Sequence, residues 1–92
     1  MYYLALAYYE SGELDKARDE FEEITISPIG RLSYGDLYPK SFYMLGIINE
    51  QQGDKIQAAD YYEQFLDLWK DADADIAELA DARERVASLK NQ

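Results

Sequence analysis

Apolar side chains recur every three or four residues through the first quarter of the chain. Residues 2–11 are rich in Tyr, Leu and Ala, and residues 13–25 place Leu14, Ala17, Phe21 and Ile24 on one helical face, with charged residues opposite. Gly12 lies between the two segments, and glycine commonly supplies the left-handed residue that ends a helix. The pattern predicts two short antiparallel helices joined at Gly12.

The second half of the chain predicts a similar pair of helices and then a single one. A helix beginning near Asp36, with Pro39 in its first turn, ends at Gly53, and another runs from about Asp54 to Lys70. The second of these buries an apolar stripe, namely Ala58, Tyr62, Phe65, Leu66 and Trp69. A last helix, capped by Asp71 or Asp73, carries the stripe Ile76, Leu79, Val86 and Leu89. The sequence therefore predicts five helices and no strand.

The two helix pairs are copies of each other. When the chain is laid over itself with one constant offset, identical residues coincide without a gap: Leu4 with Leu45, Gly12 with Gly53, Ala17 with Ala58, Asp19 with Asp60, and Glu22 with Glu63. Self-similarity at a fixed period is the signature of a helical repeat array.

These copies resemble the tetratricopeptide repeat (TPR) family. Its pattern appears as Phe42-x2-Leu45-Gly46 followed by Ala58-x3-Tyr62, and in the first copy as Met1-x2-Leu4-Ala5-x2-Tyr8 followed by Ala17-x3-Phe21. Three positions depart from the pattern, because Met1 stands for a tryptophan, Asn49 for a tyrosine and Lys70 for the closing proline. The spacing of the two copies is also longer than the usual TPR period of about 34 residues. The resemblance implies an all-α TPR-like helical solenoid in which small residues allow close helix packing.

The resemblance also divides the chain into a single domain with four parts. We expect repeat one over residues 1–26, a connector over 27–36, repeat two over 37–71 and a capping helix over 73–90. The connector contains Pro28 and Gly30 but also apolar residues, so we expect it to fold back on the repeats. The capping helix matches the first helix of an unfinished third repeat, since Leu79 follows Leu45 at the usual spacing of the family.

Composition narrows the class of partner. Nineteen acidic residues against nine basic ones give a net charge of -10, and such a surface repels nucleic acid and anionic membranes. No apolar run approaches the roughly 20 residues needed to span a bilayer, and no targeting segment is recognisable, which predicts a cytoplasmic protein. The acidity is compatible with ordinary solubility, with a basic partner or with adaptation to high salt.

The residue types argue against an enzyme. The chain has no histidine and no cysteine, so the usual Ser-His and Cys-His arrangements are excluded, as are histidine-bound and cysteine-bound metals. The acidic run at residues 71–75 imitates the start of a calcium loop, but Ile76 and Ala82 occupy the positions that need glycine and glutamate. We predict no catalytic residue, no metal site and no cofactor.

The family resemblance implies where a partner would bind. TPR ligands lie in a concave groove along the first helices of successive repeats, and those positions are Tyr2, Leu6, Tyr9, Glu10, Tyr43, Ile47, Glu50 and Gln51. Ala77, Asp81 and Glu84 would continue this row. The basic residues with which some TPR proteins clamp a terminal carboxylate are not at these positions, so the row favours an amphipathic or basic peptide or helix. These tyrosines could instead pack between neighbouring helices.

A structural role is the alternative. The chain resembles the C-terminal end of bacterial TPR arrays, some of them attached to serine/threonine kinase domains, and it would then close a longer array whose upstream repeats bind the ligand. The chain opens inside a helix without a cap, which suggests an excised fragment. The first helix would then leave apolar surface bare, and we expect fraying of residues 1–5 or weak self-association at that edge.

Overall fold

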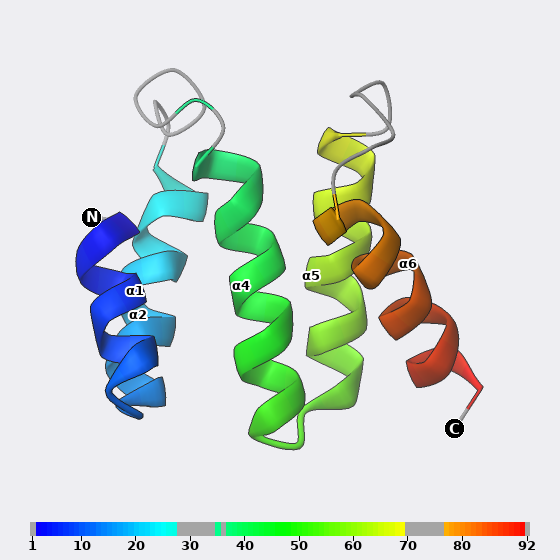
Figure 1. Cartoon of the computed structure of the whole chain (residues 1–92), viewed down its shortest axis with the longest axis horizontal. Helices are drawn as coiled ribbons and strands as arrows, with labels where there is room; N and C mark the ends of the chain where they lie inside the picture. The colour runs from blue at the N-terminus through cyan, green and yellow to red at the C-terminus, as the bar shows by residue number, and fades with distance from the viewer. Residues whose placement is uncertain (1, 28–34, 36, 70–76, 92) are drawn as a thin grey trace.

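The computed structural model describes residues 2–27, 35, 37–69 and 77–91. Within these ranges the elements are all α-helices: α1 (Tyr2–Glu10), α2 (Leu14–Ile26), α4 (Leu37–Gln51), α5 (Lys55–Leu68) and α6 (Ala77–Lys90). In Figure 1, α4 lies at the centre, with α1 and α2 on one side and α5 and α6 on the other. The predicted all-α repeat fold is confirmed, and the ends of the helices lie within two residues of the predicted ones wherever both are described.

The two helix pairs are built with the same turn. Gly12 and Gly53 have φ angles of 85° and 87°. In each turn the glycine N–H donates to a carbonyl three residues back, while the following residue, Glu13 or Asp54, donates to a carbonyl five residues back. This pattern is the Schellman motif, which needs a left-handed residue and therefore favours glycine. The sequence prediction that glycine closes the first helix of each pair is confirmed.

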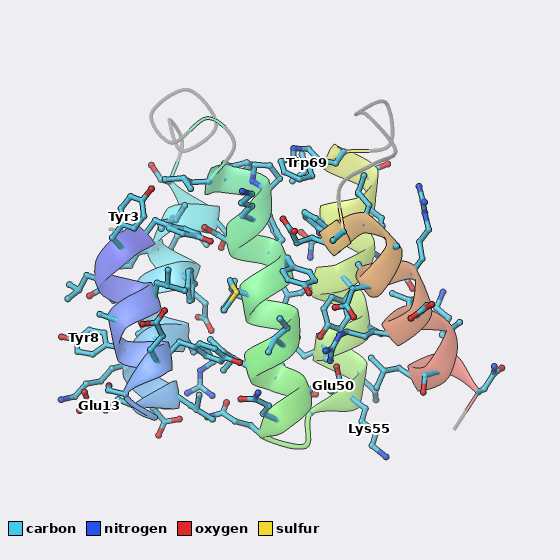
Figure 2. The ribbon with its side chains drawn as sticks, viewed as in Figure 1. Tyr3, Tyr8, Glu13, Glu50, Lys55 and Trp69 are labelled. Carbon is cyan, nitrogen blue, oxygen red and sulfur yellow. The ribbon has the colours of Figure 1, made fainter. Side chains whose placement is uncertain are left out.

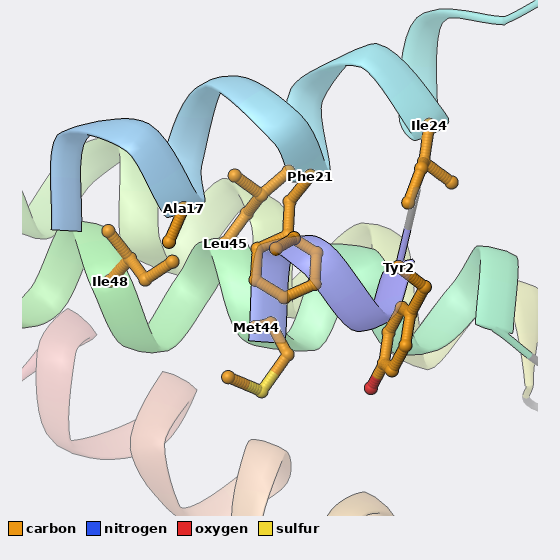
Figure 3. Packing of buried hydrophobic residues seen from close by; sticks show 8 residues of the cluster. Tyr2, Ala17, Phe21, Ile24, Met44, Leu45 and Ile48 are labelled. Carbon is orange, nitrogen blue, oxygen red and sulfur yellow. The ribbon is translucent and has the colours of Figure 1, made fainter. Parts of the chain in front are cut away.

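Two apolar clusters form the core, and α4 belongs to both. The first joins α1, α2 and α4 through the buried residues Tyr2, Ala5, Ala17, Phe21, Ile24, Met44, Leu45 and Ile48. Figure 3 shows Phe21 pointing from α2 toward Met44 and Leu45 of α4. The second joins α4, α5 and α6 through Phe42, Ala58, Tyr62, Phe65, Leu79 and Ala82. Leu79 of α6 thus packs against α5 as Leu45 of α4 packs against α2, so α6 takes the role of a repeat's first helix.

Gly46 allows the closest approach between two helices. A Cβ atom added there would lie 2.5 Å from Cε1 of Tyr62, which is closer than real Cβ atoms come. Tyr62 is fully buried, so its ring lies directly against the α4 backbone. The small residue expected at this position is required by the packing.

Some expectations are modified by the structure. Leu66 and Trp69 are half-buried rather than buried, because they lie at the edge of the second cluster. The prediction that the connector folds back on the repeats concerns mostly residues 28–34, which lie outside the described residues. The predicted helix caps Asp36, Asp71 and Asp73 also lie outside them. Ile76, Lys70 and Met1 also lie outside them. In the part of the chain that the structure covers, no helix is long and apolar enough to cross a membrane.

Candidate protein-interaction site

The predicted binding residues lie on α1 and α4, the first helices of the two repeats, and we call their row the inner face. It consists of Tyr2, Leu6, Tyr9 and Glu10 of α1 and Tyr43, Ile47, Glu50 and Gln51 of α4. Within each helix these positions follow the spacing i, i+4, i+7 and i+8, which places them on one side of the helix. The Nε2 atom of Gln51 donates a hydrogen bond to Tyr9 Oη at 3.1 Å and so joins the two halves of the row.

The inner face extends toward α6. Burial raises the pKa of Tyr2, and the neighbouring Tyr3 and the Glu78 carboxylate raise it further. Glu78 also contributes to the raised pKa of Tyr43, after burial and the contact with Asp81. The Glu78 carboxylate of α6 thus makes a minor contribution to the raised pKa of one tyrosine on α1 and of one on α4.

The eight predicted residues differ in their exposure. Tyr2 is buried in the first cluster, where its ring meets Phe21 edge to face at 5.5 Å between centroids. Glu10 and Gln51 are exposed, and the other five are half-buried, namely Leu6, Tyr9, Tyr43, Ile47 and Glu50. Tyr2 therefore acts as a core residue, and the accessible apolar surface of the row comes from the half-buried residues.

Tyr43 and Glu50 are held by a polar network that connects α4 with α5 and α6. Tyr43 Oη donates to Asp81 Oδ2 at 2.5 Å, and Arg85 Nε donates to the same oxygen at 2.6 Å. Arg85 Nη1 also donates to Glu50 Oε1 at 3.0 Å, and Tyr62 Oη donates to that oxygen at 2.9 Å. Glu50 is labelled in Figure 2. The network links the side chains of Tyr43 and Glu50 to α5 and α6.

The protonation states follow from this geometry. Burial and the hydrogen bond to Asp81 raise the pKa of Tyr43 well above its usual range, and burial with the hydrogen bond to Glu50 does the same for the pKa of Tyr62. Burial tends to raise the pKa of Asp81, but the hydrogen bonds from Tyr43 and Arg85 outweigh it and lower the pKa. At neutral pH the phenols are protonated. Two carboxylates against one guanidinium leave the network with one net negative charge.

The sequence predicts an inner-face position for three members of this network, namely Tyr43, Glu50 and Asp81. It predicts Tyr62 only as a buried residue of the repeat, and it gives no role to Arg85. The spacing of Asp81 and Arg85 indicates an i,i+4 ion pair on α6. No local pattern indicates that Arg85 would reach Glu50 on a different helix, far away in the sequence.

Three surface cavities bordered by described residues lie elsewhere. They have volumes of about 320, 540 and 320 Å³ and are lined mainly from α4 with α5, from α5 with α6, and from the ends of α4 and α5 beside Trp69. None of the eight inner-face residues lines any of them. Within the described ranges no cluster of three or more acidic residues could hold a metal ion.

The fold defines the class of protein: an array of antiparallel helix pairs in which each repeat stacks its first helix on the second helix of the repeat before it. Two models of the family described as Tetratricopeptide repeat match residues 1–25 and 39–68, which together make up more than half of the chain. The chain belongs to the tetratricopeptide repeat family. Comparison with curated proteins and with solved structures gave no match. Tetratricopeptide repeats are generally modules of protein–protein interaction, and the family is a non-enzymatic scaffold.

Proposed function

We propose that this chain is a non-enzymatic scaffold that binds a peptide or helix along its inner face. The observation that carries the proposal is a set of three half-buried apolar residues, Leu6, Tyr9 and Ile47, which pack against the first core cluster in the same row as the acidic residues Glu10 and Glu50; we call these three the apolar strip. Apolar surface of this kind provides affinity, and the surrounding acids select a partner with basic residues.

The charges around the strip favour a basic amphipathic partner. Glu10 is exposed beside Tyr9, and the network of Glu50, Asp81 and Arg85 carries one net negative charge on the α6 side. Arg85 is already bound to two carboxylates, so it is poorly placed to clamp the terminal carboxylate of a peptide. A segment with leucine-like side chains on one face and lysine or arginine at its edges fits this surface.

Within the row, the residues have different roles in this proposal. Leu6, Tyr9 and Ile47 contact the partner directly, and Glu10 with Gln51 form the polar rim. Tyr43 and Glu50 act mainly by positioning, since both are tied to α6 by hydrogen bonds. Tyr2 supports the strip from the core.

A titration of ¹⁵N-labelled protein with a synthetic amphipathic helix of leucine and lysine tests the proposal. We expect the largest amide shifts at Leu6, Tyr9 and Ile47, and binding about tenfold weaker in Ile47→Ala, because one buried aliphatic side chain contributes roughly 1.5–3 kcal/mol. Ile56→Ala on α5 is the matched control, because Ile56 is exposed and lies outside the inner face. Shifts that map to α2 and α5, or equal affinity in the two variants, would refute the proposal.

The structural alternative is favoured by the surface of α6. None of the exposed residues of α6 is a large apolar one, so this helix presents a small and polar surface, as a closing helix should; they are Ala77, Ala80, Arg83, Glu84, Ala87, Ser88 and Lys90. In this second proposal the chain closes a longer array and its inner face binds nothing. The same titration separates the two, since a closing unit would show no saturable shifts along the inner face.

A further inference from the structure

A cavity of about 540 Å³ lies between the beginning of α5 and the end of α6, and we call it the α5–α6 groove. It is lined by Lys55, Ile56 and Ala59 of α5 and by Leu89 and Lys90 of α6. Its volume falls within the roughly 300–1,000 Å³ that are typical of ligand sites. The groove shares no residue with the inner face, so a function for it goes beyond the proposed one.

The middle of the groove is apolar. Ile56 is 87% exposed, which is the largest exposed fraction among the large apolar side chains exposed in the described part of the chain. Leu89, on the opposite wall, is half-buried and packs against the second core cluster. Single exposed apolar residues are common on protein surfaces, but here Ile56, Ala59 and Leu89 line one cavity. The groove therefore offers a place where an apolar side chain of a partner is removed from water.

The first repeat closes the corresponding place with polar groups. The residues equivalent to Ile56 and Ala59 are Asp15 and Arg18. Both bind Gln52, because Gln52 Nε2 donates to Asp15 Oδ1 at 2.9 Å and Arg18 Nη1 donates to Gln52 Oε1 at 2.7 Å. In the second repeat an isoleucine and an alanine replace this acid and this base, so the same hydrogen bonds cannot form there. The groove is thus a difference between the two copies and not part of the packing that they share.

The α6 wall of the groove comes from a helix that continues past the end of the repeat pattern. In the repeat alignment, Ala87 takes the position of Gly53, the glycine that ends the first helix of the second repeat. Ala87 is helical, and α6 continues to Lys90. This additional stretch of helix carries Leu89 and Lys90, the two residues of α6 that line the groove. The groove therefore depends on a feature that α6 does not share with α1 and α4.

The charged groups around the groove favour an acidic partner. None of the five lining residues is acidic, although the protein as a whole carries a net charge of -10. Lys90 Nζ lies 2.5 Å from Glu63 Oε1, so Lys90 contributes mainly its aliphatic stem to the wall. Lys55 is exposed and forms no ion pair with a described residue, and Figure 2 shows it extending away from the molecule at the beginning of α5. A cation without a partner beside an apolar cavity selects a ligand that is both acidic and apolar.

We propose that the α5–α6 groove binds a short acidic segment of a partner protein. A leucine or isoleucine side chain of this segment lies between Ile56 and Leu89, and a neighbouring aspartate or glutamate pairs with Lys55. The inner face is proposed to take a basic partner, whereas the groove takes an acidic one. Because the two surfaces have no residue in common, each can be tested without altering the other.

A small molecule and a second copy of the chain fit the groove less well. Small-molecule sites bury about 70–90% of their ligand, but this groove is open, since Ile56 is 87% exposed. A second copy brings another net charge of -10, whereas a short segment brings only the few carboxylates that face Lys55. A segment of a partner protein therefore agrees best with the open shape and with the charge.

A titration of ¹⁵N-labelled protein with a short synthetic peptide tests the proposal. The peptide has one leucine flanked on both sides by glutamates, with glycine and serine at the remaining positions. Saturable amide shifts should map to Ile56, Ala59 and Leu89. Ile56→Ala should weaken binding by about fivefold or more, because the leucine loses an apolar contact. Lys55→Glu should also weaken it by about fivefold or more, because a like charge replaces an ion pair.

Matched variants separate the groove from general effects of charge and hydrophobicity. Arg83→Glu makes the same charge reversal at an exposed residue of α6 that does not line the groove, and Ile26→Ala shortens the same side chain at a 77% exposed position of α2. Both should bind the peptide like the original protein, and circular dichroism verifies that all variants are folded. A second peptide with lysine in place of each glutamate should bind the groove of Lys55→Glu more tightly than that of the original protein, as judged from the Leu89 amide, because the ion pair is then restored with opposite signs.

Three results would overturn the proposal. The first is the absence of saturable shifts in the groove, or equal affinity for a peptide in which serine replaces the leucine. The second is an equal loss in Arg83→Glu and Lys55→Glu, which would mean that binding depends only on total charge. The third is a dimer of the protein alone in sedimentation experiments that Ile56→Asp converts to a monomer, since a second copy would then occupy the groove. Failure of the inner-face titration would leave these outcomes unaffected, because its probe is basic and its variant is Ile47→Ala.

Discussion

Replacing Gly46 with alanine tests whether the close contact between α4 and α5 sets the stability of the second repeat. The added Cβ would lie 2.5, 2.6 and 2.9 Å from three ring carbons of Tyr62. That ring has little freedom to move, because it is fully buried and its hydroxyl donates to Glu50 at 2.9 Å. Either the helices separate or the Tyr62 hydrogen bond breaks.

Opposing effects determine the size of the change. Alanine is favoured over glycine in a helix by about 1 kcal/mol. Overpacking a close-packed site costs about 1–3 kcal/mol, and loss of a hydrogen bond to a charged group costs about 1.5–3 kcal/mol. Because either cost alone is reduced by the gain in helix propensity, the net expectation is a loss of about 1–2 kcal/mol in the free energy of unfolding. In a domain of this size it corresponds to a fall in Tm of roughly 4–16 °C.

Urea unfolding followed by circular dichroism measures this change. Ala80→Gly is the matched control, because Ala80 takes the repeat position of Gly46 on α6 and is exposed. It should cost only the helix propensity of about 1 kcal/mol. The double variant Gly46→Ala/Tyr62→Phe recreates the Ala5 and Phe21 pair of the first repeat and should recover part of the loss. If Gly46→Ala is as stable as the original protein, the contact does not limit the packing.

Three further predictions follow from the structure. Because the folded state raises the pKa values of Tyr43 and Tyr62 above the ordinary 10.0, their contribution to stability is intact below pH 10 and is lost as the pH rises above it. The urea midpoint should therefore fall between pH 8 and pH 12, and it should fall less steeply in Tyr62→Phe. An equally steep fall in this variant would contradict the prediction. The Tm should rise slightly between low salt and about 1 M NaCl, because salt screens repulsion in like-charged pairs such as Asp15 with Asp19. The rise should be small, since Arg18 lies 3.5 Å from Asp15 and offsets part of this repulsion. A Tm that does not change with salt would mean that the acidic residues are already compensated. Gly53→Ala should cost about 1–2 kcal/mol in urea unfolding, since φ at Gly53 is 87°, and Gly53→Asn should cost less; equal costs would argue against backbone strain as the cause.

The sequence alone determined the helices, their turns and their order. These features depend on local interactions: apolar residues three or four apart define one face of a helix, and Gly12 and Gly53 supply the left-handed residue of the turn. The repetition of the pattern in the second helix pair added the packing plan, because small and aromatic residues at matching positions imply matching contacts. The family and the all-α repeat fold could therefore be predicted without coordinates.

The tertiary structure decided which residues of the repeated pattern are covered and which polar groups meet. Leu4 and Leu45 are equivalent in sequence, yet only Leu45 is buried. The reason is that α2 packs against this side of α4, whereas no described helix packs against the matching side of α1. Tyr2 was expected on the binding face but packs against Phe21 in the core. The hydrogen bond from Tyr43 to Asp81 joins two different helices that are not adjacent in the sequence. Burial and long-range hydrogen bonding depend on the positions of neighbouring helices, and periodicity within one helix carries no information about those positions.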